Sequence, residues 1–174
     1  MLGNEALLKF QRAIEINSHY SKPQNNLGNV LSELNRYDEA IDHYKKAIAI
    51  EPNYAEAFYN KSIVLKDQGK LEESLVQYIT AIEIKHDYFE AHINIGIYWD
   101  NRGEFPKALS LFKKAIQIQP QNAHGYLTLA NSFYNNKNWH EAINNYRVAL
   151  KLKPELTQAK TNLDIVLRQV GNKK

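Results

Sequence analysis

The sequence predicts an all-α solenoid of ten stacked helices, and the main reason is an internal period of 34 residues. Five residues stand 34 positions apart along the chain: Ser18, Pro52, His86, Pro120 and Pro154. A fixed period of this length is typical of helix-turn-helix arrays, in which each repeat contacts only its neighbours. The remaining structural signals of the chain follow the same period.

A small–aromatic–small pattern recurs in the second half of each period. Its three columns are Ala6, Ala40, Ser74, Ala108 and Ala142; Phe10, Tyr44, Tyr78, Phe112 and Tyr146; and Ala13, Ala47, Ala81, Ala115 and Ala149. Helices whose axes cross about 8–10 Å apart need small residues at the contact, and an aromatic ring fills the space beside them. We therefore expect the second helix of each period to pack through this stripe.

The turns inside each period also have a recognisable chemistry. Gly69 and Gly103 stand just past first helices, where a left-handed residue ends a helix. Asn35 holds the equivalent place and tolerates that conformation, whereas Lys137 does not. We expect the turn at Lys137 to be strained or differently shaped.

No linker, low-complexity stretch or change of composition divides the chain, so residues 1–174 are expected to form a single domain. The expected units are a half repeat at 1–20, full repeats at 21–54, 55–88, 89–122 and 123–156, and a C-terminal capping helix at 157–174.

These motifs resemble the tetratricopeptide repeat family over nearly the whole chain. The first full repeat carries the resemblance in Asn26-Leu27-Gly28-Asn29, Tyr37-Asp38-Glu39-Ala40-Ile41 and Lys45-Lys46-Ala47-Ile48, followed by Pro52. The repeat that begins at Ala55 departs most, with Lys61 in a leucine or isoleucine column. The resemblance implies a right-handed superhelix whose first helices line a concave groove and whose second helices form the convex side.

Composition excludes several classes of partner and location. The chain has no cysteine, its net charge is +3, and no apolar run reaches the length of a membrane span. We therefore predict no nucleic-acid partner and no membrane insertion. The segment Met1-Leu2-Gly3-Asn4-Glu5 lacks the features of a signal peptide, which makes a cytoplasmic location the default expectation.

No arrangement of residues indicates an enzyme, a metal site or a cofactor site. The six histidines are spread over five of the expected units and form no short ligand motif, and His92 is the best metal candidate because it follows His86 by six residues. It occupies the column of Phe58 and Tyr126, so a packed histidine at the edge of the core is the favoured interpretation. We predict no catalytic residues, no metal and no cofactor.

An amide column runs along the expected groove: Asn26, Asn60, Asn94, Thr128 and Asn162. It resembles the superhelical repeats of O-linked N-acetylglucosamine transferases, in which such asparagines bind the backbone of extended peptides. An amide both donates and accepts hydrogen bonds, so it can pair with any peptide unit. The alternative is that asparagine serves helix packing at this position, and the sequence leaves both interpretations open.

The centre of the groove is predicted to be apolar with an acidic rim. The rim residues are Glu56, Asp67, Glu90 and Asp100. The predicted peptide-binding groove contains Asn26, Asn29, Tyr59, Asn60, Ile63, Ile93, Asn94, Ile97, Leu127, Asn131, Tyr134 and Asn162. Its apolar members are expected to form one exposed patch, because large exposed apolar patches mark interaction sites.

The sequence thus predicts a non-enzymatic protein–protein interaction module that binds a peptide segment or a partner protein, apolar with basic flanks, in its concave groove. One alternative is a scaffold that self-associates through its N-terminal helix, where Leu7 and Leu8 precede Phe10 with no first helix to cover them. Another is an interaction domain cut from a larger protein, such as a multidomain enzyme.

Overall fold

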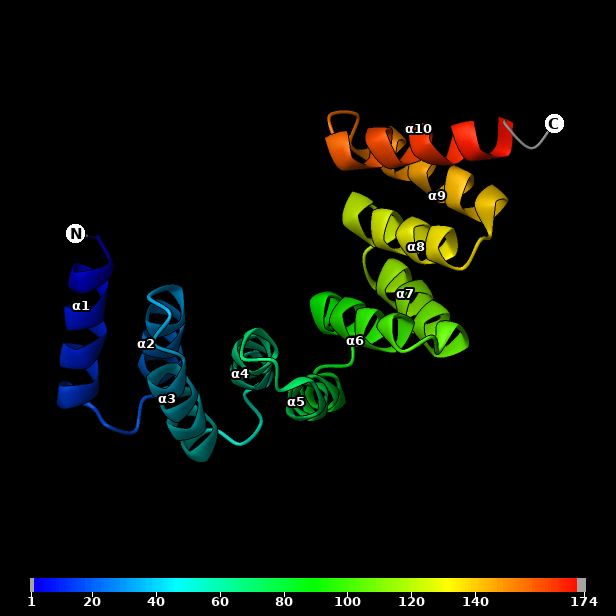
Figure 1. The fold of residues 1–174 in the computed structure, drawn as a ribbon. Helices are drawn as coiled ribbons and strands as arrows, with labels where there is room; N and C mark the ends of the chain where they lie inside the picture. Colours follow the sequence, from blue (N-terminus) through cyan, green and yellow to red (C-terminus); the bar gives the residue numbers. More distant parts are fainter. Residues whose placement is uncertain (1, 172–174) are drawn as a thin grey trace. The chain divides into compact units, whose positions relative to one another are not determined.

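The computed structural model describes residues 2–171, with side chains from Ala6 onward, and over this range it contains ten helices and no strand (Figure 1). The helices are α1 (Leu2–Ile16), α2 (Ser21–Glu33), α3 (Tyr37–Ile50), α4 (Ala55–Asp67), α5 (Leu71–Ile84), α6 (Phe89–Asn101), α7 (Phe105–Ile118), α8 (Ala123–Asn135), α9 (Trp139–Leu152) and α10 (Thr157–Gly171). The predicted all-α fold of repeated helix pairs is confirmed. Met1 and residues 172–174 of the expected terminal segments lie outside the described residues.

Contacts between Cα atoms divide the chain into two compact units, Met1–His86 and Asp87–Lys174. The first unit contains α1 and the pairs α2–α3 and α4–α5, and the second contains the pairs α6–α7 and α8–α9 and then α10. Within each unit, the two helices of a pair have the most extensive mutual contact. The second helix of one pair also packs against the first helix of the next, as α3 does on α4 and α7 on α8.

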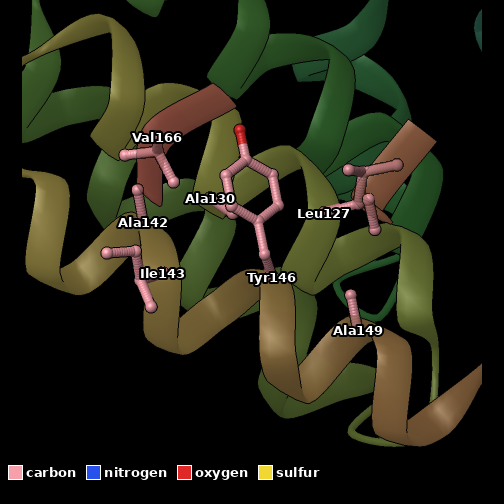
Figure 2. Packing of buried hydrophobic residues seen from close by; sticks show 8 residues of the cluster. Leu127, Ala130, Ala142, Ile143, Tyr146, Ala149 and Val166 are labelled. Carbon is pink, nitrogen blue, oxygen red and sulfur yellow. The ribbon is translucent and has the colours of Figure 1, made fainter. Parts of the chain in front are cut away.

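The predicted small–aromatic–small stripe forms the core of both units. In α9, Ala142, Tyr146 and Ala149 are buried, and Figure 2 shows the Tyr146 ring rising from the helix between the two alanines. In the first unit, a Cβ atom on Gly28 would lie 2.6 Å from Cε1 of Tyr44. The close approach of the Tyr44 ring therefore requires glycine at position 28, and the ring of Phe112 has the same effect at Gly96.

All four helix pairs end their first helix with the same turn. Asn35, Gly69, Gly103 and Lys137 have positive φ angles of 59°, 78°, 76° and 60°. At the last of these turns the amide of Lys137 donates to the carbonyl of Tyr134 and the amide of Asn138 donates to the carbonyl of Phe133. This is the bonding pattern of the Gly69 turn, so the turn is not differently shaped and Lys137 carries the strain of a left-handed conformation.

The second repeat accommodates its departures from the pattern by small polar adjustments. The Ser74 hydroxyl, which replaces an alanine, donates to the Ser62 carbonyl at 2.8 Å. Lys61 is half-buried, and its burial and the nearby charge of Lys45 lower the pKa of its ammonium group. Its alkyl stem packs in the place of a leucine, as is common for lysine at the edge of a core.

Candidate functional site

Two equivalent hollows lie between neighbouring first helices, one in each unit. The α2–α4 hollow has a volume of about 170 Å³ and is lined by Asn29, Ser32, Glu33, Tyr44, Asn60 and Ile63. The α8–α10 hollow has a volume of about 300 Å³ and is lined by Asn131, Tyr134, Asn135, Tyr146, Asn162 and Ile165. Every residue of the second lining stands three repeat lengths after its counterpart in the first.

A third hollow, between α6 and α8, uses the same repeat positions. It has a volume of about 260 Å³ and is lined by Ile97, Asp100, Asn101, Phe112, His124, Leu127, Thr128, Asn131, Ser132, Asn135 and Gln158. Six of these residues are the repeat counterparts of the α2–α4 lining. The hollows are therefore a product of the repeat geometry, and their chemistry is set by which side chain each repeat places there.

Tyrosine–asparagine pairs form the inner wall of the α2–α4 and α8–α10 hollows. The Tyr44 hydroxyl donates to Oδ1 of Asn29 at 2.8 Å, and the Tyr146 hydroxyl donates to Oδ1 of Asn131 at 2.7 Å. Nδ2 of Asn162 donates to the same Oδ1 of Asn131 at 2.9 Å. Since two donors hold Oδ1 of Asn131, its Nδ2 group is left to donate to other acceptors.

Burial raises the pKa of both tyrosines above the ordinary value. It raises the pKa of Tyr146 to about 12, an effect that the nearby side-chain amide of Asn162 opposes. Burial likewise raises the pKa of Tyr44, and the charges of Glu33 and Glu56 add to the rise. Both hydroxyls therefore remain proton donors to their asparagines at neutral pH.

The middle repeats lack this pair. In the third repeat Ile97 stands at the position that Asn131 holds in the fourth repeat. Phe112 stands at the position of Tyr146, so neither residue needs a hydrogen bond. In the second repeat Ile63 stands opposite Tyr78, whose hydroxyl is buried and has no hydrogen-bond partner among the described residues. Burial raises the pKa of Tyr78 to about 12, and the nearby hydroxyls of Ser62 and Ser74 oppose that rise.

The predicted exposed apolar patch is wrong for two of its residues. Ile93 is 4% exposed and Leu127 is 2% exposed, and both belong to hydrophobic clusters. The reason is that neighbouring first helices pack together, which places Ile93 in one cluster with Leu129 of α8. Ile97 is 38% exposed, and the remaining apolar members, Tyr59, Ile63 and Tyr134, are half-buried.

Much of the amide column is engaged inside the protein. Asn60 donates to Oδ1 of Asn25 at 3.1 Å, Asn162 donates to Asn131, and Asn94 donates to the Glu90 carbonyl at 2.9 Å. The bonds of Asn60 and Asn162 join neighbouring first helices. One N–H of each of these two side chains therefore serves helix packing, as the alternative interpretation expected. Asn26 is half-buried on α2.

Two acidic residues of the predicted rim accept hydrogen bonds across the first helices. Oε1 of Glu56 accepts from Nδ2 of Asn25 at 3.2 Å. Oδ1 of Asp100 accepts from the Ser132 hydroxyl at 2.7 Å and from Nδ2 of Asn136 at 3.2 Å. Sequence reasoning missed Ser132, although a signal exists, because the equivalent position holds Val30, Val64 and Tyr98 in the other repeats.

A larger cavity of about 780 Å³ lies away from the amide column. Its lining comes mainly from the α7–α8 and α9–α10 turns: Gln119, Pro120, Gln121, Asn122, Ala123, His124, Leu152, Lys153, Glu155 and Leu156. Asn122 in this lining caps α8, since its side chain accepts from the amide of His124 at 3.0 Å. Nδ2 of Asn122 also donates to Oε1 of Gln119 at 2.8 Å, so these two side chains serve the turn itself.

The described residues contain neither a metal-binding cluster nor a membrane-spanning helix. Histidine, aspartate and glutamate residues do not gather there in groups of three or more that would bind a metal ion. Within the same part of the chain, no helix has the length and apolar character needed to cross a membrane.

Stacked helix pairs with small–aromatic–small cores and hollows between first helices define a class of helical repeat protein. The Tetratricopeptide repeat models match residues 21–54, 43–76 and 89–122, and a TPR repeat model matches residues 64–101. Each matched range overlaps the next, so together they cover residues 21–122 without a gap, which is more than half of the chain. The chain belongs to the tetratricopeptide repeat family, whose members are protein-interaction modules.

Solved structures share the fold at low sequence identity. The crystal structure of MamA is 19% identical, has a TM-score of 0.76, and the match covers 90% of this chain and 91% of that chain. TTC0263, a thermophilic TPR protein in Thermus thermophilus, is 22% identical with a TM-score of 0.75, over 95% of this chain and 90% of that chain. No curated protein sequence matches the chain significantly.

Proposed function

We propose that this protein is a non-enzymatic interaction module that binds an extended peptide segment, or an extended segment of a partner protein, at the hollows between first helices within each unit. The observation that carries the proposal is the recurrence of one hollow at the same repeat positions, once in the first unit and twice in the second. A ligand with a repeating backbone is the natural match for a site that repeats along a helix stack.

The chemistry of the hollows supports a peptide. Asn29 and Asn131 have their Oδ1 atoms occupied by tyrosine hydroxyls, so they offer N–H donors, which suit peptide carbonyl groups. Ile97 offers exposed apolar surface. Among the acidic rim residues, Glu56, Asp67 and Glu90 are exposed, which favours basic flanks in the ligand and raises the association rate.

A peptide library displayed on beads, probed with the labelled protein, is the first experiment. The tightest peptide is then titrated by calorimetry against variants. Asn131→Ala and Asn29→Ala are each expected to weaken binding by roughly 0.5–1.5 kcal/mol, the usual net contribution of one hydrogen bond. Ile97→Asp is expected to weaken it more, because a charge would face an apolar anchor. Ile97 is preferred to Ile93 here, since Ile93 is buried and its replacement would damage folding.

Lys113→Ala is the matched control, because Lys113 is exposed on α7, a second helix. It is expected to leave the affinity unchanged. The proposal fails if Lys113→Ala and Lys114→Ala abolish binding while Ile97→Asp and the asparagine variants bind as the unmodified protein does.

Self-association is a second candidate function, and α1 is the observation that favours it. Leu8 is 65% exposed and Ile16 is 81% exposed. Phe10 and Ala13 are half-buried, whereas their repeat counterparts Tyr44 and Ala47 are fully buried. Sedimentation equilibrium of the chain with and without Leu8→Glu tests this proposal: a concentration-dependent mass that the substitution removes supports it, and a monomer at all concentrations contradicts it. A role as the interaction domain of a larger protein, such as a multidomain enzyme, is compatible with either function.

A further inference from the structure

We infer that the α6–α8 hollow is a subsite for a lysine side chain of the bound peptide, with the alkyl stem on Ile97 and the ammonium group at Asp100. The inference rests on the proposed function and specifies which peptides the second unit recognises.

Asp100 brings an uncompensated negative charge into an otherwise uncharged lining. The hollow contains no Lys, Arg or Glu, and α8 carries none of these residue types or Asp. Asp100 is half-buried and, among the described residues, it makes its two hydrogen bonds but no ion pair. A partly desolvated carboxylate without a cation is a site where a ligand cation gains more than it would in water.

The cations closest in sequence are engaged elsewhere. Arg102 lies over the Tyr98 ring, with 4.8 Å from its Cζ to the ring centroid. Lys107 lies over the Trp99 ring at 4.2 Å, and its Nζ is 3.3 Å from Oε2 of Glu104. Neither supplies the charge that Asp100 lacks.

The shape and polarity of the hollow suit a long aliphatic chain that ends in a cation. Ile97 is 38% exposed and lies one helical turn before Asp100 on α6, so its surface leads toward the carboxylate. The stem of a lysine covers such apolar surface while its ammonium group reaches a polar end. Asn101 and Asn135 also line the hollow, and their amide oxygens are acceptors for the remaining ammonium protons.

Lysine is favoured over arginine by the hydrogen bonds that Asp100 already makes. Both of its donors, the Ser132 hydroxyl and Nδ2 of Asn136, occupy the same oxygen, Oδ1. The carboxylate therefore offers one oxygen to a ligand. A guanidinium group binds best to two carboxylate oxygens at once, whereas an ammonium group is a point charge that needs only one.

The test uses a bead-displayed library of short peptides in which every position varies, incubated with the unmodified protein and with Asp100→Asn. We expect lysine to be enriched at one position with the unmodified protein, and this enrichment to disappear with Asp100→Asn while the preferences at other positions stay. Asn keeps an oxygen for Ser132 and Asn136, so the hollow retains its shape. Glu141→Gln is the matched control: it removes the same charge from an exposed residue of α9, outside the hollow and outside the acidic rim, and is expected to keep the lysine preference.

The best peptide is then compared, by fluorescence anisotropy, with copies in which the lysine is replaced by norleucine or by arginine. Against the unmodified protein, norleucine is expected to bind roughly 10-fold more weakly, since a hydrogen bond to a charged group is lost. Against Asp100→Asn the lysine and norleucine peptides are expected to bind equally. Peptide binding with no lysine preference, or tighter binding of the arginine peptide, overturns the lysine subsite but leaves the proposed function standing. Absence of any peptide binding overturns the proposed function as well.

Discussion

The hydroxyl of Tyr146, a residue of the aromatic core stripe on α9, donates a hydrogen bond to Asn131 on α8, with 2.7 Å between the two oxygen atoms. The same bond joins Tyr44 to Asn29 in the first full repeat. In the third repeat both partners are apolar, as Ile97 and Phe112. The hydroxyl and the amide are thus present together or absent together in three of four repeats, and the second repeat, with Tyr78 opposite Ile63, is the exception.

Replacing each tyrosine by phenylalanine is expected to give two different results. Tyr44→Phe and Tyr146→Phe each remove a satisfied hydrogen bond and are expected to lower the free energy of unfolding by about 1 kcal/mol. Tyr78→Phe removes a buried hydroxyl that has no partner among the described residues, so it is expected to leave the free energy unchanged or raise it. Urea denaturation of the three variants checks this. A loss for Tyr78→Phe equal to the other two would show that its hydroxyl is satisfied.

Supplying the missing amide is expected to stabilise the second repeat in a way that depends on Tyr78. Ile63→Asn places an acceptor where Asn29 and Asn131 stand in their repeats, but it also removes a half-buried apolar side chain. A double-mutant cycle separates the two effects. We expect Ile63→Asn to be more favourable by about 1 kcal/mol in the presence of Tyr78 than in the Tyr78→Phe background. Equal effects in the two backgrounds would exclude the bond.

Lys137→Gly is expected to raise the free energy of unfolding by about 1 kcal/mol, because a residue with a side chain pays about that amount in the left-handed region. The φ angle of Lys137 is 60°, and Gly69 and Gly103 hold the equivalent turns. The matched control is Lys113→Gly, an exposed position inside α7, where glycine is expected to lower the free energy by about 1 kcal/mol. Thermal and urea denaturation measure both. A free energy of unfolding that falls in both variants, or rises in both, would contradict a strained turn at Lys137.

His43 is expected to make the first unit less stable in acid. Burial, and next the charge of Lys46, lower the pKa of its imidazole, and Nδ1 lies 2.7 Å from Oε1 of Gln24 on α2. The unfolded chain therefore binds a proton at His43 more readily than the folded chain does. The free energy of unfolding must fall as the pH drops below about 6.5, the ordinary histidine value, until it passes the lowered pKa.

His43→Leu removes this titration. Urea denaturation of both proteins at about pH 7.5 and about pH 5 is expected to show a smaller loss for the variant, since acid destabilises the folded state only where the unfolded state binds more protons. Equal losses in the two proteins would mean that His43 titrates alike in the folded and unfolded chain.

The repeat pattern was sufficient to predict the helices, because each core contact joins columns that the period makes visible, such as Gly28 with Tyr44. The burial of Ile93 and Leu127 was not predictable in this way. It depends on how closely neighbouring first helices approach. The spacing of apolar residues within one helix gives no information about that distance. The period also continues through His86 and Asp87, so no local signal marked the division of contacts there. The tyrosine–asparagine pair lies in two columns of the sequence, and only the structure showed that they meet.

The bonds from Tyr146 and Asn162 have a consequence for the entropy of binding. An amide held by two donors at one oxygen cannot rotate, so the Asn131 donors keep one direction before any ligand arrives. Ordering a free side chain on binding costs about 0.5–1.5 kcal/mol. Folding has already met that cost at Asn131, so Nδ2 of Asn131 is a preorganised hydrogen-bond donor to the carbonyl groups of the proposed peptide ligand. The exposed stem of Ile97, in contrast, must still be immobilised when the ligand binds.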